Sequence, residues 1–157
     1  MYGRGYRHRP VDEVVAEVRA LCAAGHRYII FLDDNIIGSP NWARELSTKM
    51  VPLKVSWGGQ THLGSARDPE LIRLAGKSGM SALFIGIESV NRAALIGARK
   101  DVNNIARYRE WVKVMHDNGI VIVAGMIFGF DEDDPSVFAR TVEVIDRLDI
   151  AVGNFSP

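Results

Sequence analysis

The sequence predicts an α/β fold built on a parallel sheet of βα repeats, amounting to half to three-quarters of a TIM-type barrel. Helix-like and strand-like segments alternate along the 157 residues, and apolar strand-like runs begin near positions 28, 55, 82, 120 and 150. Strands that alternate with helices at this spacing are typical of βα units and a parallel sheet. The chain has no Walker loop, and no Rossmann glycine fingerprint follows the first run, which favours a barrel-type sheet. We expect a single domain over residues 1–157.

The helices are predicted from apolar residues at helical spacing combined with start and stop signals. The first runs from Val11 to Cys22, with Pro10 in its first turn and Gly25 as its stop. The second opens at Ser39-Pro40 and ends at Met50. Three more are expected, one from Asp68-Pro69 to Gly79, one from Asn103 or Asn104 to Gly119, and one from Asp134-Pro135 with Phe138, Val142, Ile145 and Leu148 on one face.

The strands are the short apolar runs that lie between these helices. They are expected at residues 28–32, 55–57, 82–87, 120–128 and 150–155. The run from Tyr28 to Leu32 is continuously apolar, which is typical of a strand covered on both faces. Five strands are too few to close an eight-stranded barrel, so we expect open sheet edges that favour self-association.

The composition excludes several classes of protein. The 19 Lys and Arg residues balance the 19 Asp and Glu residues, so a strongly basic nucleic-acid binder is not expected. The apolar content of 47% is that of a globular domain and not of a disordered chain. No apolar run approaches the roughly 18 residues of a membrane span, and the polar, basic first ten residues do not form a signal peptide. The single cysteine, Cys22, favours a reducing, cytoplasmic setting, and alone it holds neither zinc nor an iron–sulfur cluster.

Polar residues follow every expected strand, where ligands of parallel βα folds gather. After the first strand come Asp33, Asp34 and Asn35, and after the third come Glu88 and Ser89. The other strand ends carry Gly58, Gly59, Gln60 and His62, then Gly129 to Glu132, and finally Asn154 and Ser156. Because the strand bodies are apolar, this distribution predicts a ligand pocket at the carboxyl edge of the sheet.

The residues by themselves leave the chemistry of this pocket open. Asp33 and Asp34 suit a hard cation or an ammonium group, but one of them can equally cap the next loop. Glu88 ends a buried strand and needs a partner, which could be a ligand hydroxyl, a ligand amine or an arginine. Gly125 lies inside the expected strand 120–128 and Gly129 ends it, and glycine in a strand indicates a bulge, a close approach of a backbone or ligand, or helix packing.

Three segments together resemble the radical S-adenosylmethionine (radical SAM) superfamily, and more narrowly its branch that often carries a cobalamin-binding domain. The segments are FLDDNIIGSPNWAREL, LFIGIESVNRAAL and IVIVAGMIFGFDEDDPSVFARTVEVID. Their order and spacing carry the resemblance, which covers nearly the whole chain from about position 4. It implies a partial barrel of the radical SAM core that binds S-adenosylmethionine as a small-molecule cofactor.

The resemblance also implies roles for individual residues. One of Asp33, Asp34 and Asn35 would contact the amino group of the methionine moiety. Glu88 and Ser89 would lie near the ribose and the methionine. The pattern glycine-x-isoleucine-x-glycine-x-x-glutamate, on the strand that packs against adenine in the family, is matched by Gly125, Ile127, Gly129 and Glu132.

One departure from the family concerns the redox centre. The family's cysteine-x-x-x-cysteine-x-x-cysteine loop, which binds a 4Fe-4S cluster, is absent from this sequence. We expect the chain to begin just after that loop and to end before the rest of the core. The cluster, and cobalamin where it is used, would then belong to the complete parent, and the isolated chain would be inactive. Two alternatives remain: a non-catalytic half-barrel that binds a nucleoside-like ligand or a partner chain, and a metal-dependent enzyme that uses Asp33, Asp34 and Glu88.

Overall fold

The computed structural model describes residues 7–89 and 105–156, in which helices and parallel strands alternate. The strands are β1 (Tyr28–Ile30), β2 (Ser56–Thr61), β3 (Met80–Glu88), β4 (Val121–Ile127) and β5 (Val152–Ser156). The helices are α1 (Val11–Ala23), α2 (Pro40–Met50), α3 (Pro69–Lys77), α5 (Ile105–Asp117) and α6 (Val137–Arg147), with short 3-10 helices η1 (Val51–Leu53) and η2 (Leu63–Arg67). The expected helix start at Asn103 or Asn104 lies outside the described residues.

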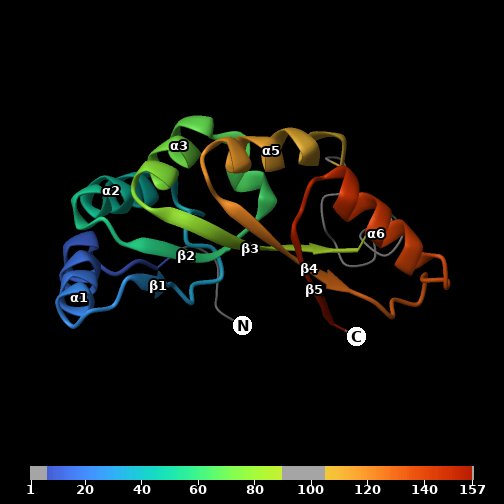
Figure 1. Cartoon of the computed structure of the whole chain (residues 1–157), viewed down its shortest axis with the longest axis horizontal. Helices are drawn as coiled ribbons and strands as arrows, with labels where there is room; N and C mark the ends of the chain where they lie inside the picture. Colours follow the sequence, from blue (N-terminus) through green and yellow to red (C-terminus); the bar gives the residue numbers. More distant parts are fainter. Residues whose placement is uncertain (1–6, 90–104, 157) are drawn as a thin grey trace.

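The strands form one curved sheet in chain order, β1-β2-β3-β4-β5, and every neighbouring pair is parallel. The helices follow the convex side of this sheet in an arc (Figure 1). This arrangement confirms the predicted parallel partial barrel. Since the helices cover one face only, the other face of the sheet stays open within the described part of the chain.

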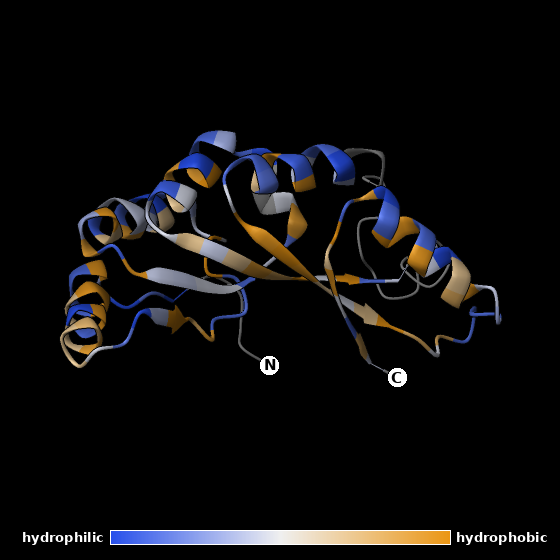
Figure 2. Ribbon diagram, in the orientation of Figure 1, coloured by the Kyte–Doolittle hydropathy of each residue, from blue (hydrophilic) through white to orange (hydrophobic). Residues whose placement is uncertain are grey.

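The core lies between the helices and the sheet. Alternate side chains of β3 and β4 point into it and are fully buried, among them Leu83, Ile85 and Ile122. The central strands are mostly apolar, whereas the outer surfaces of α3 and α5 carry the polar residues (Figure 2). Burial of each large aliphatic side chain at this interface stabilises the fold by about 1.5–3 kcal/mol.

The remaining side chains of each strand point to the open side of the sheet, which we call the inner face. Its members are Tyr28 and Ile30 on β1, Ser56, Gly58 and Gln60 on β2, Ala82, Phe84 and Gly86 on β3, Val121, Val123, Gly125 and Ile127 on β4, and Val152, Asn154 and Ser156 on β5. Tyr28 is 79% exposed and Ile30 is 64% exposed. The expectation that the first strand is covered on both faces is therefore wrong.

Two elements differ from their prediction. Strand β2 continues to Thr61 because Gly58 and Gly59 pair with β3, and Gly58 lies so close to the Ala82 carbonyl that an added β-carbon would sit 2.5 Å from its oxygen. On α6, the predicted face is only partly correct: Ile145 and Leu148 pack on the core, whereas Phe138 and Val142 are each 58% exposed. The buried stripe starts one residue earlier, at Val137, and continues through Thr141 to Leu148.

Candidate functional site

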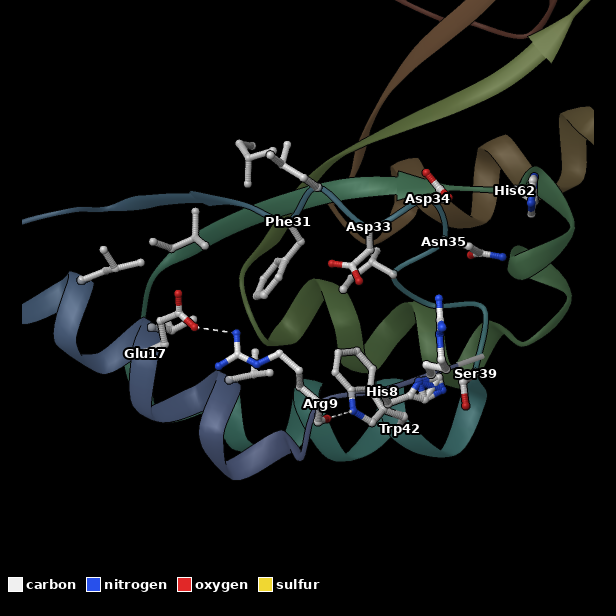
Figure 3. A pocket seen from close by; sticks show the side chains of 18 residues that line it. His8, Arg9, Glu17, Phe31, Asp33, Asp34, Asn35, Ser39, Trp42 and His62 are labelled. Carbon is white, nitrogen blue, oxygen red and sulfur yellow. Dashed lines mark hydrogen bonds and ion pairs between the residues drawn. The ribbon is translucent and has the colours of Figure 1, made fainter. Parts of the chain in front are cut away.

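A cavity of about 730 Å³ lies beside the end of β1, between α1, residues 7–9 and the loop that follows the strand (Figure 3). Residues 7–9 form its outer wall and are held by two helices. The indole nitrogen Nε1 of Trp42 donates to the Arg9 carbonyl at 2.9 Å, and the His8 ring stacks on Trp42 with 5.4 Å between ring centroids. The Arg9 guanidinium donates to Glu17 at 2.8 Å, and this hydrogen bond raises the pKa of Arg9 above its ordinary value.

The two aspartates after β1 are directed to different sides of the loop. Asp33 points into the cavity near Phe31, whereas the Asp34 carboxylate points to the opposite side (Figure 3). Asn35 is tied to the neighbouring strand, because its Oδ1 accepts a hydrogen bond from the Thr61 hydroxyl at 2.8 Å. The pair therefore does not form one dicarboxylate site.

Glu88, the last residue of β3, has a backbone conformation that is rare for a residue with a side chain. Its φ is +72°, and the register with β4 shifts between Gly86 and Glu88. This bulge turns the carboxylate back onto the inner face, where Glu88 Oε1 would be 2.6 Å from a β-carbon added to Gly86. Outliers of this kind cost roughly 1–3 kcal/mol and cluster at functional sites.

A second glycine extends this surface onto β4. Gly86 and Gly125 are register partners, and the Phe84 side chain reaches across from β3 to Gly125. A β-carbon added to Gly125 would lie 2.6 Å from Phe84 Cζ. The ring of Phe84 and the carboxylate of Glu88 thus cover two paired glycines near the carboxyl edge of the inner face. Ile127 follows on the same face, and Ser89 is buried directly after Glu88.

The turn after β4 contains the other predicted site residues. Gly129 has a φ of +95°, which favours glycine. The backbone N–H groups of Gly129 and Phe130 both donate to Asp133 Oδ2 at 3.1 Å, and this closes the turn. Glu132 is exposed within it. Glycine therefore has a conformational role here.

The structure separates the predicted site residues into two groups. Asp33, Asp34 and Asn35 lie at the end of β1, and Glu88 lies at the end of β3, with β2 between them. At about 4.8 Å per strand the two groups are roughly 10 Å apart. Among residues 7–89 and 105–156, no three His, Cys, Asp or Glu side chains are placed to hold a metal ion. The arrangement thus speaks against the metal-dependent alternative with Asp33, Asp34 and Glu88.

A 4Fe-4S cluster also does not fit the residues present. The family's cluster needs three cysteines, and the single Cys22 is half-buried on α1.

A membrane-spanning helix is not found either: among residues 7–89 and 105–156, every helix is too short or too polar to cross a bilayer.

Sequence reasoning missed Phe84, Gly86 and Trp42 as residues of the site. Phe84 and Gly86 lie in an apolar run, and that run does not reveal which face the helices leave open. Gly86 carried a weak signal, since glycine inside a strand indicates close approach of another group. Trp42 resembled an ordinary packing residue, and only the fold brings it to Arg9.

Comparisons with known proteins agree with this fold. The sequence model of the radical SAM superfamily matches residues 1–145. A bacteriochlorophyllide d C-12(1)-methyltransferase from Chlorobaculum tepidum is 35% identical over 149 residues, which are 92% of this chain and 32% of that protein. A hopanoid C-2 methylase from Rhodopseudomonas palustris is 29% identical over 157 residues, which are 96% of this chain and 30% of that protein. The chain spans about a third of the length of these curated relatives.

Solved structures share the fold at low sequence identity. The radical S-adenosylmethionine methyltransferase TsrM from Kitasatospora setae, with cobalamin and a [4Fe-4S] cluster bound, matches 98% of this chain and 30% of its own, with a TM-score of 0.84 and 20% identity. The cobalamin-dependent S-adenosylmethionine radical enzyme OxsB matches 98% of this chain and 24% of its own, with a TM-score of 0.75 and 14% identity. The predicted resemblance and fold class are thereby confirmed.

Proposed function

We propose that this chain, which belongs to the radical SAM superfamily, contributes the S-adenosylmethionine pocket of a larger methyltransferase-type enzyme. The complete parent would cleave S-adenosylmethionine reductively to a 5′-deoxyadenosyl radical. Its 4Fe-4S cluster, and cobalamin where it is used, would be held by parts other than these residues. This chain would bind S-adenosylmethionine, and by itself it would not cleave it.

The observation that carries the proposal is the position of Glu88 over Gly86 at the carboxyl edge of the inner face. A carboxylate accepts hydrogen bonds from two neighbouring hydroxyl groups, as the ribose of a nucleoside presents them. The φ of +72° keeps the carboxylate against the sheet instead of in solvent. In this assignment Glu88 binds the ribose, and the buried Ser89 supports the bend that directs it.

The first strand end suits the amino-acid portion of the same ligand. The Asp34 carboxylate is directed to the other side of the loop from that of Asp33, so we assign the contact with the methionine amino group to Asp34 and not to Asp33. The distance of roughly 10 Å between β1 and β3 suits a ligand whose amino-acid and nucleoside ends lie far apart. Gly125, Ile127, Gly129 and Glu132 would border the adenine end, as the family resemblance implies.

When bound in the complete enzyme, S-adenosylmethionine supplies the carbon–sulfur bond whose reduction yields the radical. The residues of this chain would bind and orient the nucleoside and the methionine portion. The single cysteine of this chain cannot ligate an iron–sulfur cluster.

Binding tests the proposal directly. We expect S-adenosylhomocysteine to bind the chain weakly, in the millimolar range accessible to ligand-observed NMR, because no iron holds the methionine end. Glu88→Gln should weaken binding about tenfold, since a hydrogen bond to a charged group is worth about 1.5–3 kcal/mol. Glu70→Gln on α3 removes an equal charge from an exposed ion pair with Arg73 and should leave binding unchanged. Absence of binding at millimolar ligand would contradict the proposal.

Turnover by the chain itself is the second test. After anaerobic cluster reconstitution and addition of dithionite, the chain should produce no 5′-deoxyadenosine above a blank. Detection of 5′-deoxyadenosine would overturn the proposed division between this chain and the rest of its parent.

A second candidate function, association with another chain, is favoured by the end strand of the sheet. Tyr28, Ile30 and the nearby Leu32 are 79%, 64% and 85% exposed, and β1 has a pairing partner on one side only among the described residues. Exposed apolar end strands promote pairing between chains. Sedimentation should then show concentration-dependent association that Ile30→Lys reduces, and a monomer at all concentrations would contradict it.

A further inference from the structure

We propose that Phe84 is a binding residue of this site, and that its ring forms the surface on which the nucleoside rests. This inference deepens the proposed function and rests on it. Neither the sequence nor the comparisons assign a role to Phe84, which lies in the middle of β3 on the inner face and is half-buried.

The ring of Phe84 occupies the place that a side chain at position 125 would take. Three of its atoms, Cζ, Cε1 and Cε2, lie 2.6, 3.0 and 3.6 Å from the β-carbon position of Gly125. Any ligand that approaches β4 at this point therefore meets the Phe84 ring before it meets the backbone. Gly125 is needed in this arrangement because it leaves room for the ring.

The neighbour of the ring is the carboxylate of Glu88. Gly86, under that carboxylate, and Gly125, under the ring, are register partners on adjacent strands. An apolar aromatic surface thus lies beside an acceptor of hydrogen bonds. This pair suits a ligand that joins an apolar ring to hydroxyl groups, which is the chemistry of a nucleoside.

The other neighbours of Phe84 leave the ring accessible. Its register partners are Gln60 on β2, which is exposed, and Val123 on β4, which is half-buried. Neither residue is a large aromatic that would cover the ring. A ring stacked on Phe84 could thus also come within reach of the Gln60 amide.

The competing arrangement is a base that packs directly on the Gly125 backbone, with the Phe84 ring turned aside. The two arrangements predict opposite effects of removing the ring. If the ring supports the ligand, its removal weakens binding, since stacking of a base on an aromatic side chain contributes to affinity. If the ring competes with the ligand, its removal leaves affinity unchanged or raises it.

The test is a titration of S-adenosylhomocysteine into the chain, followed by saturation-transfer NMR. Phe84→Leu keeps apolar volume and removes the ring, and Tyr108→Leu on α5, whose ring packs beside Trp111 on the helix side, is the matched control. We expect Phe84→Leu to weaken binding about tenfold and to reduce transfer to the adenine protons more than to the methionine protons. Tyr108→Leu should change neither quantity. Gly125→Ala should also weaken binding, because the added methyl group displaces the ring.

The outcomes separate this inference from the function on which it rests. If the wild-type chain binds, Glu88→Gln weakens binding and Phe84→Leu does not, the role of Phe84 is overturned and the proposed function stands. If the wild-type chain does not bind at millimolar ligand, both are overturned. An equal loss of transfer to adenine and methionine protons in Phe84→Leu would indicate a general structural role and would also overturn the inference.

Discussion

Glu88 Oε1 lies over Gly86, two residues earlier on the same strand, and would be 2.6 Å from a β-carbon placed there. In a regular strand, residues two apart point to the same face but stand roughly parallel. The bulge and the φ of +72° at Glu88 bend its side chain back along β3. The carboxylate is thereby held on the inner face by the backbone.

The backbone strain at Glu88 can be measured with two variants that both delete the carboxylate. Glu88→Ala keeps a β-carbon in the left-handed region, whereas Glu88→Gly does not, and that penalty is about 1–2 kcal/mol. We expect Glu88→Gly to be the more stable of the two by about 1 kcal/mol in urea unfolding. Equal stability would show that the left-handed conformation is not kept in solution.

Alanine substitution at two inner-face glycines should affect different properties, binding at Gly86 and stability at Gly58. At Gly86 the new methyl group meets the flexible end of Glu88, so the side chain moves and stability changes little, but binding of S-adenosylhomocysteine falls. At Gly58 it meets the Ala82 carbonyl at 2.5 Å, and the backbone cannot yield cheaply. We expect Gly58→Ala to cost about 1–3 kcal/mol, as overpacking does. Thermal melts of both variants measure the change in stability, and titration with S-adenosylhomocysteine measures the change in binding.

The wall of the strand-end cavity depends on Trp42. Trp42→Phe keeps an aromatic ring beside His8 and removes the N–H that donates to the Arg9 carbonyl at 2.9 Å. We expect a loss of about 1 kcal/mol and faster tryptic cleavage after Arg7, since a single hydrogen bond contributes about 0.5–1.5 kcal/mol. Trp111→Phe on α5 is the control. Cleavage after Arg7 that is no faster than in this control would mean that other contacts hold residues 7–9.

The turn before α6 should show a dependence on acid. Asp134 accepts a hydrogen bond from the Ser136 backbone N–H at 2.7 Å, and the hydrogen bonds to Ser136 lower the pKa of Asp134 below its ordinary value of 3.8. Because the folded pKa is the lower one, this stabilisation is present above about pH 3.8 and is lost as the pH falls further. Asp134→Asn should lower Tm slightly at neutral pH, and the difference from the wild type should vanish in acid. Asp131→Asn in the same turn is the control. A difference in Tm between Asp134→Asn and the wild type that persists in acid would contradict a stabilising role of the ionised Asp134 carboxylate.

Much of the fold follows from local pattern. The predicted helix starts at Pro40 and Pro69 coincide with the structure, because proline suits the first turn of a helix and nothing later in the chain alters that preference. For the helix expected from Asp134-Pro135, the buried face was predicted only in part, since the side chains buried in its first turns are Val137 and Thr141. Two apolar stripes run along that helix, and their hydrophobicity alone does not decide which one meets the sheet.

The sequence by itself determined the alternation of helices and strands, the polar groups at the strand ends and the membership in a superfamily. These properties are local or depend on order along the chain. Only the tertiary structure decided that Asp33 and Asp34 point to different sides, that no described helix covers the inner face and that the Phe84 ring covers Gly125. These features involve neighbouring strands. They depend on which face of the sheet the helices cover and on the one-residue bulge at Glu88. Neither condition is encoded in any single segment, because each arises from the packing of several.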